Sequence, residues 1–390
     1  MTGSFNQSRI PFIRFGPGKR SELPSLVRSY GDTCLILTGK RSFLGSPHWE
    51  DLLHGLKKNN ITHFHEIIRH EPSPEIIDHN VQKYSGRNIR VIVSIGGGSV
   101  LDAGKAISAM LMEQGPVMDF LEEIGHRKPS GAKIPFIAVP TTSGTGSETT
   151  KNAVISKVGP LGFKKSLRHD RYVPDVSVVD PELTLTCPAE TTAACGMDTF
   201  TQLLESYTAP TSTPFTDALA FNALKYVINA IQKVYHAPHD LRARTHMAYG
   251  SMISGITLAN AGLGLVHGFA SPIGGSIPIP HGVVCGTLMG TVTKFNIHTL
   301  CKGAPEHPAL KKYAATGMIF DGNAKKDPAY YHTILLDKIF EMTRHFNIPR
   351  LGAYGLSSKD LDSIVERTGH KNNPAHFSKT ELKQMLNQRL

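Results

Sequence analysis

The spacing of apolar residues along this chain changes once, near Pro188. Before that point, short apolar runs of strand length alternate with amphipathic stretches that have helical spacing. Such alternation favours a largely parallel α/β sheet. The predicted strands are 33–40, 88–99, 133–143 and 176–180, and the predicted helices are 47–60 and 73–86.

After Pro188 the pattern is helical, and no convincing alternating strand follows. Thr186 resembles a helix N-cap, with Pro188 in the first turn and an acidic residue close behind. A chain of 390 residues is long enough to bury two cores. We therefore expect an α/β domain in 1–185 and an all-α domain in 186–390. The predicted C-terminal helices lie at 191–207, 215–237, 244–269 and 329–346.

The composition favours a soluble globular protein, with 40% hydrophobic and 19% charged residues. No apolar run approaches the roughly 20 residues that span a bilayer, and the first residues lack the apolar core of a secretory signal. The five cysteines form no CxxC pair, and most stand in apolar surroundings that favour a reduced core thiol. We expect a cytoplasmic protein with no membrane partner.

The formal net charge of +10 raises the question of nucleic acid or another anionic ligand. The basic residues are scattered, however, and no nucleic-acid-binding motif accompanies them. The densest basic run, 164–171, is interpreted as a solvated loop, with a phosphate-facing role as the alternative. We expect no nucleic-acid partner.

A carboxylate, an amide and two imidazoles form the candidate metal site. Asp198 and Gln202 are four residues apart in a predicted helix, so they share one face. His267 and His281 flank a glycine- and proline-rich segment. A carboxylate with two imidazoles is a common ligand set for zinc or iron, although a lone histidine beside glycine is more often a packing residue.

Two glycine- and hydroxyl-rich segments, 95–106 and 140–148, each follow a predicted strand. Glycines let a ligand approach the backbone, and a helix N-terminus presents free N–H groups to phosphate. The first segment does not fit the usual GxGxxG fingerprint. From the residues alone, a phosphate site and a structural turn both stay open.

Several ordered motifs together resemble the iron-containing (group III) alcohol dehydrogenases. The resemblance runs nearly from end to end of the chain. It rests on RFGPGKRSELP near the start, IGGGSVLDAGKA, AVPTTSGTGSETTKNAVI, VPDVSVVDPELT, GMDTFTQLLESY, GLGLVHGFASPIGGSIPIPHG, FNIPRLGAYGL and a late NNP.

The resemblance implies a parallel-type dinucleotide-binding sheet in the first domain and a metal-binding catalytic domain after it. It places the cofactor pyrophosphate at the GGGS segment and other cofactor parts at PTTSGTGSE. The implied lysine is Lys164, although the adjacent Lys165 leaves the register open. The cofactor residues implied in these segments are Gly97, Gly98, Ser99, Asp102, Thr141, Thr142, Ser147 and Lys164.

The resemblance also implies that Asp198, His267 and His281 bind a divalent ion. Most family members have histidine where this chain has Gln202, whose amide oxygen is a weaker ligand. Gln202 is therefore either a fourth ligand or a hydrogen-bonding residue behind the ligands. Many relatives carry another histidine at the position of Ser271, so proton relay here falls to Ser271, water or another group. Iron(II) and zinc both stay open.

The cofactor preference is predicted from the loop after the strand at 33–40. Family members that use NAD tend to carry an aspartate there, whereas this chain has Gly39, Lys40 and Arg41. A loop that lacks an acidic residue and carries two cations can bind the 2′-phosphate of NADP(H). We therefore expect NADP(H) to be preferred over NAD(H), with solvated loop cations as the alternative.

The resulting functional hypothesis is a metal-dependent oxidoreductase that transfers hydride between NAD(P)(H) and a small alcohol or aldehyde. The metal would polarise the substrate oxygen. Within the fold, the alternative is a relative of glycerol-type dehydrogenases or maleylacetate reductases. Outside it, the alternative is a catalytically silent nucleotide-binding protein. A homodimer is an open expectation, and the sequence leaves the substrate unassigned.

Overall fold

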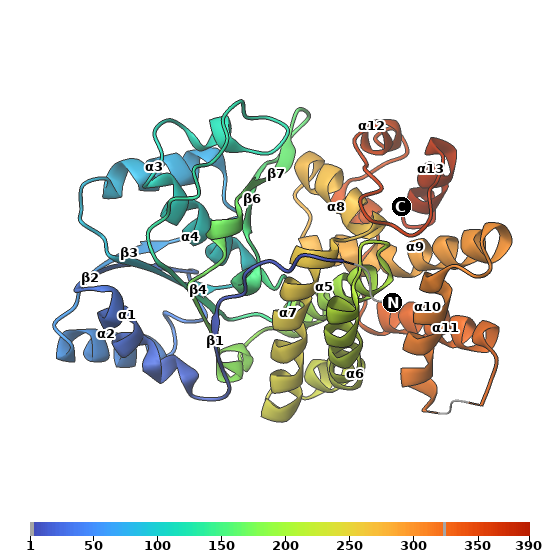
Figure 1. Ribbon diagram of the computed structural model, residues 1–390, viewed down its shortest axis with the longest axis horizontal. Helices are drawn as coiled ribbons and strands as arrows, with labels where there is room; N and C mark the ends of the chain where they lie inside the picture. Colours follow the sequence, from blue (N-terminus) through green and yellow to red (C-terminus); the bar gives the residue numbers. More distant parts are fainter. Residues whose placement is uncertain (1–3, 323–324) are drawn as a thin grey trace.

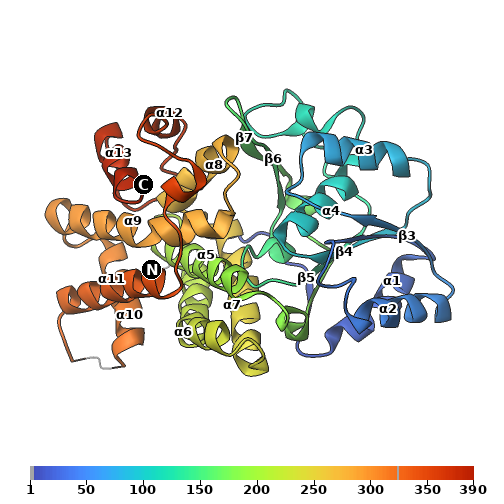
Figure 2. The ribbon, with the colours of Figure 1, turned by 180° about the vertical axis from the view of Figure 1, so that it is seen from behind.

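The computed structural model describes residues 4–322 and 325–390. It has a sheet-containing half and a helical half that lie side by side, as Figure 1 and the reverse view in Figure 2 show. The sheet ends with a strand at Val179, and the next long helix begins at Ala189. The predicted boundary at 185 and 186 falls in this connection, and we propose it as the domain boundary.

Six strands form the main sheet in the order β1-β8-β5-β4-β2-β3, and every neighbouring pair is parallel. The predicted fold class is therefore confirmed. All four predicted strands are present, and the sequence analysis missed β1 and β3. The strands are β1 Phe12–Phe15, β2 Thr33–Thr38, β3 Thr62–Ile67, β4 Val91–Gly96, β5 Phe136–Pro140 and β8 Val176–Val179.

Helices cover both faces of this sheet, because its strands are apolar on both sides. Leu35 and Leu37 of β2 belong to the core under α3 and α4. Cys34 and Ile36, which point the other way, belong to the core under α1 and α2. The helices are α1 Leu23–Tyr30, α2 Pro47–Lys58, α3 Pro74–Tyr84 and α4 Gly98–Met110.

An antiparallel hairpin stands apart from the main sheet and faces the helical half near α8 (Figures 1 and 2). Its strands are β6, Asn152–Lys157, and β7, Phe163–Arg168. The interpretation of 164–171 as a loop was therefore wrong over most of its length. The alternation was missed because charged residues occupy both faces of β7, where several of them pair with glutamates.

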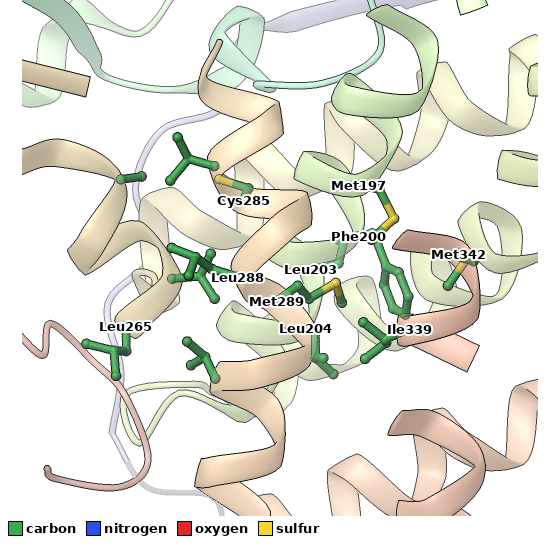
Figure 3. Packing of buried hydrophobic residues seen from close by; sticks show 14 of the residues in the cluster. Met197, Phe200, Leu203, Leu204, Leu265, Cys285, Leu288, Met289, Ile339 and Met342 are labelled. Atoms are coloured by element: carbon green, nitrogen blue, oxygen red, sulfur yellow. The ribbon is translucent and has the colours of Figure 1, made fainter. Parts of the chain in front are cut away.

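The second half is helical throughout its described residues, as the spacing predicted. Its core gathers side chains from most of its helices, and Figure 3 shows part of the packing around α5 and α9. The helices are α5 Ala189–Thr208, α6 Pro214–His236, α7 Leu241–Ala261, α8 Leu265–Ser276, α9 His281–Gly303, α10 Pro308–Asp321, α11 Pro328–His345, α12 Leu361–Glu366 and α13 Lys379–Asn387.

The start of α5 differs from the prediction. The N-cap is Pro188, not Thr186, and Thr192 donates the first intrahelical bond to the Pro188 carbonyl. Thr186 instead lies in a turn closed by the bond from Cys187 N to Thr184 O. Because Thr186 and Cys187 belong to this turn, they are not part of α5, and the helix begins at Ala189.

The predicted helical stretch 244–269 is divided between α7 and α8. Gly262 ends α7 with a positive φ of 74°, which a helix cannot continue through. Among the described residues, no single helix is long and apolar enough to cross a membrane; α7 and α8 meet that criterion only jointly, as a pair bent by 99°. The bend matters because it turns the start of α8 towards α5 and α9.

Candidate functional site

A cleft of about 910 Å³ lies where the two halves meet, and both halves line it. This volume suits a small-molecule or cofactor site. Nine of the residues predicted from the sequence line it together: Gly98, Ser99, Asp102, Ser147, Lys164, Gln202, His267, Ser271 and His281. The fold therefore brings residues almost 200 positions apart into one space.

The glycine-rich segment sits at the carboxyl end of β4, where α4 begins. Gly97 is the N-cap of α4, and no side chain caps this helix end. A Cβ on Gly98 would lie 2.7 Å from Thr145 Cγ2, so this position requires glycine. Thr142 lies against Gly97, which places the second glycine-rich segment beside the first. The uncapped N–H groups therefore face a cleft that is suited to phosphate.

A buried polar network joins these two segments. The Ser147 hydroxyl donates to Asp102, whose other oxygen accepts from Val154 N at 3.1 Å. Lys105 Nζ donates to Ser147 O at 2.9 Å and to Thr150 Oγ1 at 3.0 Å. Burial lowers the pKa of Lys105 to about 8, against the opposing charge of Asp102. Both carboxylate oxygens of Asp102 therefore accept hydrogen bonds within the protein. Ser147 connects Asp102 with Lys105 and thereby stabilises the wall of the cleft.

The candidate metal ligands come from three helices: Asp198 from α5, His267 from α8 and His281 from the first residue of α9. His267 Nε2 lies 3.3 Å from Asp198 Oδ1, and His281 Nε2 lies 3.7 Å from the same oxygen. Asp198 is 1% exposed and His267 is 4% exposed. The fold thus brings all three side chains to one point, where Asp198 and His267 are buried and His281 is partly exposed to the cleft.

Burial and mutual charge set the protonation of this cluster. Burial opposes ionisation of Asp198, but His281 and His267 outweigh it and lower its pKa to about 2. Burial lowers the pKa of His281 to about 4, although Asp198 opposes the shift. Burial also disfavours charge on His267, yet Cys285 and Glu205 raise its pKa well above 6.5. An ionised carboxylate and a neutral imidazole are forms that bind metal, while His267 must give up a proton.

Two further residues of this cluster escaped the sequence analysis. Glu205 accepts from His267 Nδ1 at 2.7 Å and from Val266 N at 2.7 Å, so it orients the imidazole. Cys285 brings its sulfur to 3.6 Å from His267 Nε2. Helical spacing could have signalled both, because Glu205 follows Asp198 by seven residues and Cys285 follows His281 by four.

The cluster fits a divalent ion on its own chemistry. Asp198, His267, His281 and Cys285 offer ligand atoms that all lie within 4.8 Å of one another. Asp198 Oδ1 is buried and has no hydrogen-bond partner, which is costly unless a cation or proton satisfies it. Gln202 also faces the cleft, but its Oε1 accepts from Ser254 Oγ at 2.7 Å.

The remaining predicted residues lie beside or outside the cleft lining. Thr141 is buried at the end of β5. Gly39, Lys40 and Arg41 follow β2 and do not line the cleft, although a Cβ on Gly39 would lie 3.9 Å from Val100 in α4. Lys40 and Arg41 are exposed. The loop therefore passes near the start of α4 with its two cations free in solvent.

The two adjacent lysines have different partners. Lys164 Nζ lies 2.8 and 2.9 Å from the two carboxylate oxygens of Glu71, and its side chain is largely buried. Lys165 pairs with Glu123 and is more exposed. Both line the cleft, and Lys164 is the one held on its inner side, near His281.

Comparison with known proteins identifies the family. Residues 11–181 match the family model described as iron-containing alcohol dehydrogenase, and residues 192–390 match that of the Fe-containing alcohol dehydrogenase family, C-terminal. The chain belongs to the iron-containing alcohol dehydrogenase family. The resemblance drawn from the sequence motifs is therefore confirmed.

Individual members of the iron-containing alcohol dehydrogenases are similar over different lengths. The probable alcohol dehydrogenase EutG of Escherichia coli is 39% identical over 53% of this chain and 51% of its own length. The NAD-dependent methanol dehydrogenase of Bacillus methanolicus is 36% identical over 58% of each chain. These alignments span little more than half of each relative. The crystal structure of a 1,3-propanediol oxidoreductase matches 100% of both chains, with a TM-score of 0.88 and 26% identity.

Proposed function

We propose that this protein is a metal-dependent oxidoreductase that transfers hydride between NAD(P)(H) and a small alcohol or aldehyde. The observation that carries the proposal is one cleft lined both by the uncapped start of α4 and by His267 and His281, which form a cluster with the buried Asp198. The first feature suits a dinucleotide phosphate, and the second suits a divalent ion. Family membership supports the same reaction class.

Each part of the cleft has a role in this reaction. The pyrophosphate would be held on backbone N–H groups of Gly97, Gly98 and Ser99, which lie at the uncapped start of α4. Gly98 has no side chain, and a Cβ there would collide with Thr145. Asp198, His267 and His281 would hold the ion, which when bound supplies Lewis acidity to the substrate oxygen. The nicotinamide supplies or accepts the hydride.

Residues of this chain also provide orientation and a proton path. Glu205 fixes the His267 ring through Nδ1 and thereby directs Nε2 towards Asp198. Lys164, held by Glu71, places a positive charge on the inner cleft wall. Ser271 lines the cleft one helical turn after His267 and is the residue we assign to proton relay with water.

We propose NADP(H) as the preferred cofactor. The support is that Lys40 and Arg41 are exposed near the start of α4 and that no carboxylate precedes them in the loop. The methanol dehydrogenase relative is described as NAD-dependent, so the proposed preference rests on this loop alone and draws no support from the family. Steady-state kcat/KM for NADPH and NADH decides between them.

A narrower substrate class is suggested by the charges of the cleft, namely aldehydes that carry an anionic group. Three lining cations pair with glutamates, and a fourth, Arg367, donates to Ser276 Oγ and Gly162 O. Lys371 is exposed in the cleft without a hydrogen bond or ion pair described in 4–322 or 325–390. Glyoxylate should therefore be reduced with a higher kcat/KM than uncharged glycolaldehyde. Lys371→Met should remove this preference, whereas Lys165→Met, whose lysine already pairs with Glu123, should keep it.

The direct test of the proposed function is His267→Ala with the exposed His63→Ala as the matched control. Metal content and aldehyde turnover should fall together in the first variant and stay at the wild-type level in the second. Wild-type metal content and turnover in His267→Ala would refute the site. Cofactor binding without turnover of any aldehyde, at full metal loading, would favour the silent nucleotide-binding alternative.

A further inference from the structure

The thiol of Cys285 lies beside the three candidate metal ligands. Cys285 lies one turn after His281 in α9 and is 0% exposed; Figure 3 shows it on this helix above Leu288 and Met289. Its sulfur lies 3.6 Å from His267 Nε2 and 3.7 Å from His281 Nε2. Most buried cysteines pack only against apolar groups, whereas this one faces two imidazoles and a carboxylate.

Four of the six distances between these atoms lie close to the edges of a tetrahedral site. With Zn–N and Zn–O bonds of about 2.0–2.1 Å and a Zn–S bond of about 2.3 Å, two N or O ligands lie about 3.3 Å apart, and sulfur lies about 3.6 Å from each nitrogen. The His267 Nε2 to Asp198 Oδ1 distance is 3.3 Å, and the two sulfur–nitrogen distances are 3.6 and 3.7 Å. Of these four distances, the one from His281 Nε2 to Asp198 Oδ1, 3.7 Å, is a few tenths longer, and all four atoms lie within 4.8 Å of one another.

Gln202 is engaged elsewhere. Its carbonyl oxygen, the only atom of the amide that can ligate, lies 2.7 Å from the Ser254 hydroxyl in a buried setting, and that hydroxyl shares its single proton between this oxygen and Ser251 O at 2.8 Å. Ligation would have to share or break this bond. Among the described residues, the polar contacts of the Cys285 sulfur are with the cluster residues themselves, and its other surroundings are the apolar core.

We propose that Cys285 is the fourth metal ligand, in the place that the sequence analysis gave to Gln202, and that the site binds zinc in preference to iron(II). The inference rests on the proposed function, since it concerns the same ion. On binding, the S–H proton leaves to solvent and the thiolate sulfur donates to the metal. Thiolate is a softer donor than an amide oxygen or imidazole, and it favours zinc.

The first test needs no substitution. Zinc-edge X-ray absorption of the zinc-loaded protein should show one sulfur at about 2.3 Å beside nitrogen and oxygen ligands at about 2.0–2.1 Å. Zinc bound by nitrogen and oxygen alone would overturn the inference and leave the proposed function standing. Failure to bind any divalent ion would overturn both.

The second test uses cobalt(II) in place of zinc, because a thiolate ligand adds a near-ultraviolet charge-transfer band to the visible cobalt spectrum. Wild type and Gln202→Ala should show this band, and Cys285→Ser should lose it and bind zinc at least about 10-fold more weakly. Cys195→Ser is the matched control, since Cys195 is a half-buried thiol near Asp198, and it should keep the band. A band that survives in Cys285→Ser, or disappears in Gln202→Ala, would overturn the inference.

Discussion

Replacing Glu205 by glutamine should weaken metal binding although Glu205 is not itself a ligand. The carboxylate accepts from both His267 Nδ1 and Val266 N, each at 2.7 Å, and is only 8% exposed. The two N–H groups donate to different carboxylate oxygens, and glutamine replaces one of these oxygens with an NH2 donor, so one of the two bonds is lost. Either Val266 N–H loses its partner or the His267 proton moves to Nε2, the nitrogen that faces Asp198.

The expected loss of metal affinity depends on which of these two changes occurs. Loss of a residue that orients a metal-bound histidine typically costs about 10- to 100-fold in metal affinity. This range corresponds to about 1.4–2.8 kcal/mol of binding free energy. The upper end applies if the tautomer changes, because a protonated Nε2 cannot donate a lone pair to the ion.

Competition against a calibrated chelator measures this affinity, with thermal unfolding of each metal-free variant as the check on folding. Glu122→Gln is the matched control, because Glu122 also lines the cleft but pairs with Arg168 at 3.1 Å. It should keep wild-type affinity. Equal zinc affinity in Glu205→Gln and wild type would refute the assignment of Glu205 as the residue that positions His267.

Three further predictions concern the fold, the buried charges and the cofactor. In Gly104→Ala the new methyl would overlap the Ser94 hydroxyl beneath α4, and thermal unfolding should show a loss of about 1–3 kcal/mol; unchanged stability would mean that helix and sheet are less tightly packed. Burial raises the pKa of Glu148 from 4.5 to about 7, so the native state holds a proton that the unfolded chain has released, and stability should fall as pH rises through this window. Glu148→Gln should remove that part of the slope in melting temperature, and identical slopes would contradict the shift. Joint replacement of Lys40 and Arg41 by alanine should lower kcat/KM for NADPH by about 10-fold or more and leave kcat/KM for NADH unchanged. A higher kcat/KM for NADH than for NADPH in the wild type would refute the proposed cofactor preference.

Local sequence determined much of this protein. The apolar runs at 33–40 and 88–99 form β2 and β4 because an all-apolar strand needs a covered sheet, and the long amphipathic stretches after Pro188 form helices. The motifs around Asp198 and His267 placed the family, which the comparisons confirm. The hairpin strand β7 was missed, because its charges are neutralised by glutamates from distant segments.

The tertiary structure alone decided how the candidate site is completed. Spacing within α5 puts Gln202 on the same face as Asp198, but only the packing of α7 beside α5 gives that amide to Ser254. Likewise, Cys285 has the sequence surroundings of a core cysteine, and only the meeting of α8 with α9 turns its sulfur towards two imidazoles. Spacing along one helix brings Cys285 beside His281 and Gln202 beside Asp198, but Ser254 and His267 come from other helices, so the completed contacts depend on how the helices pack.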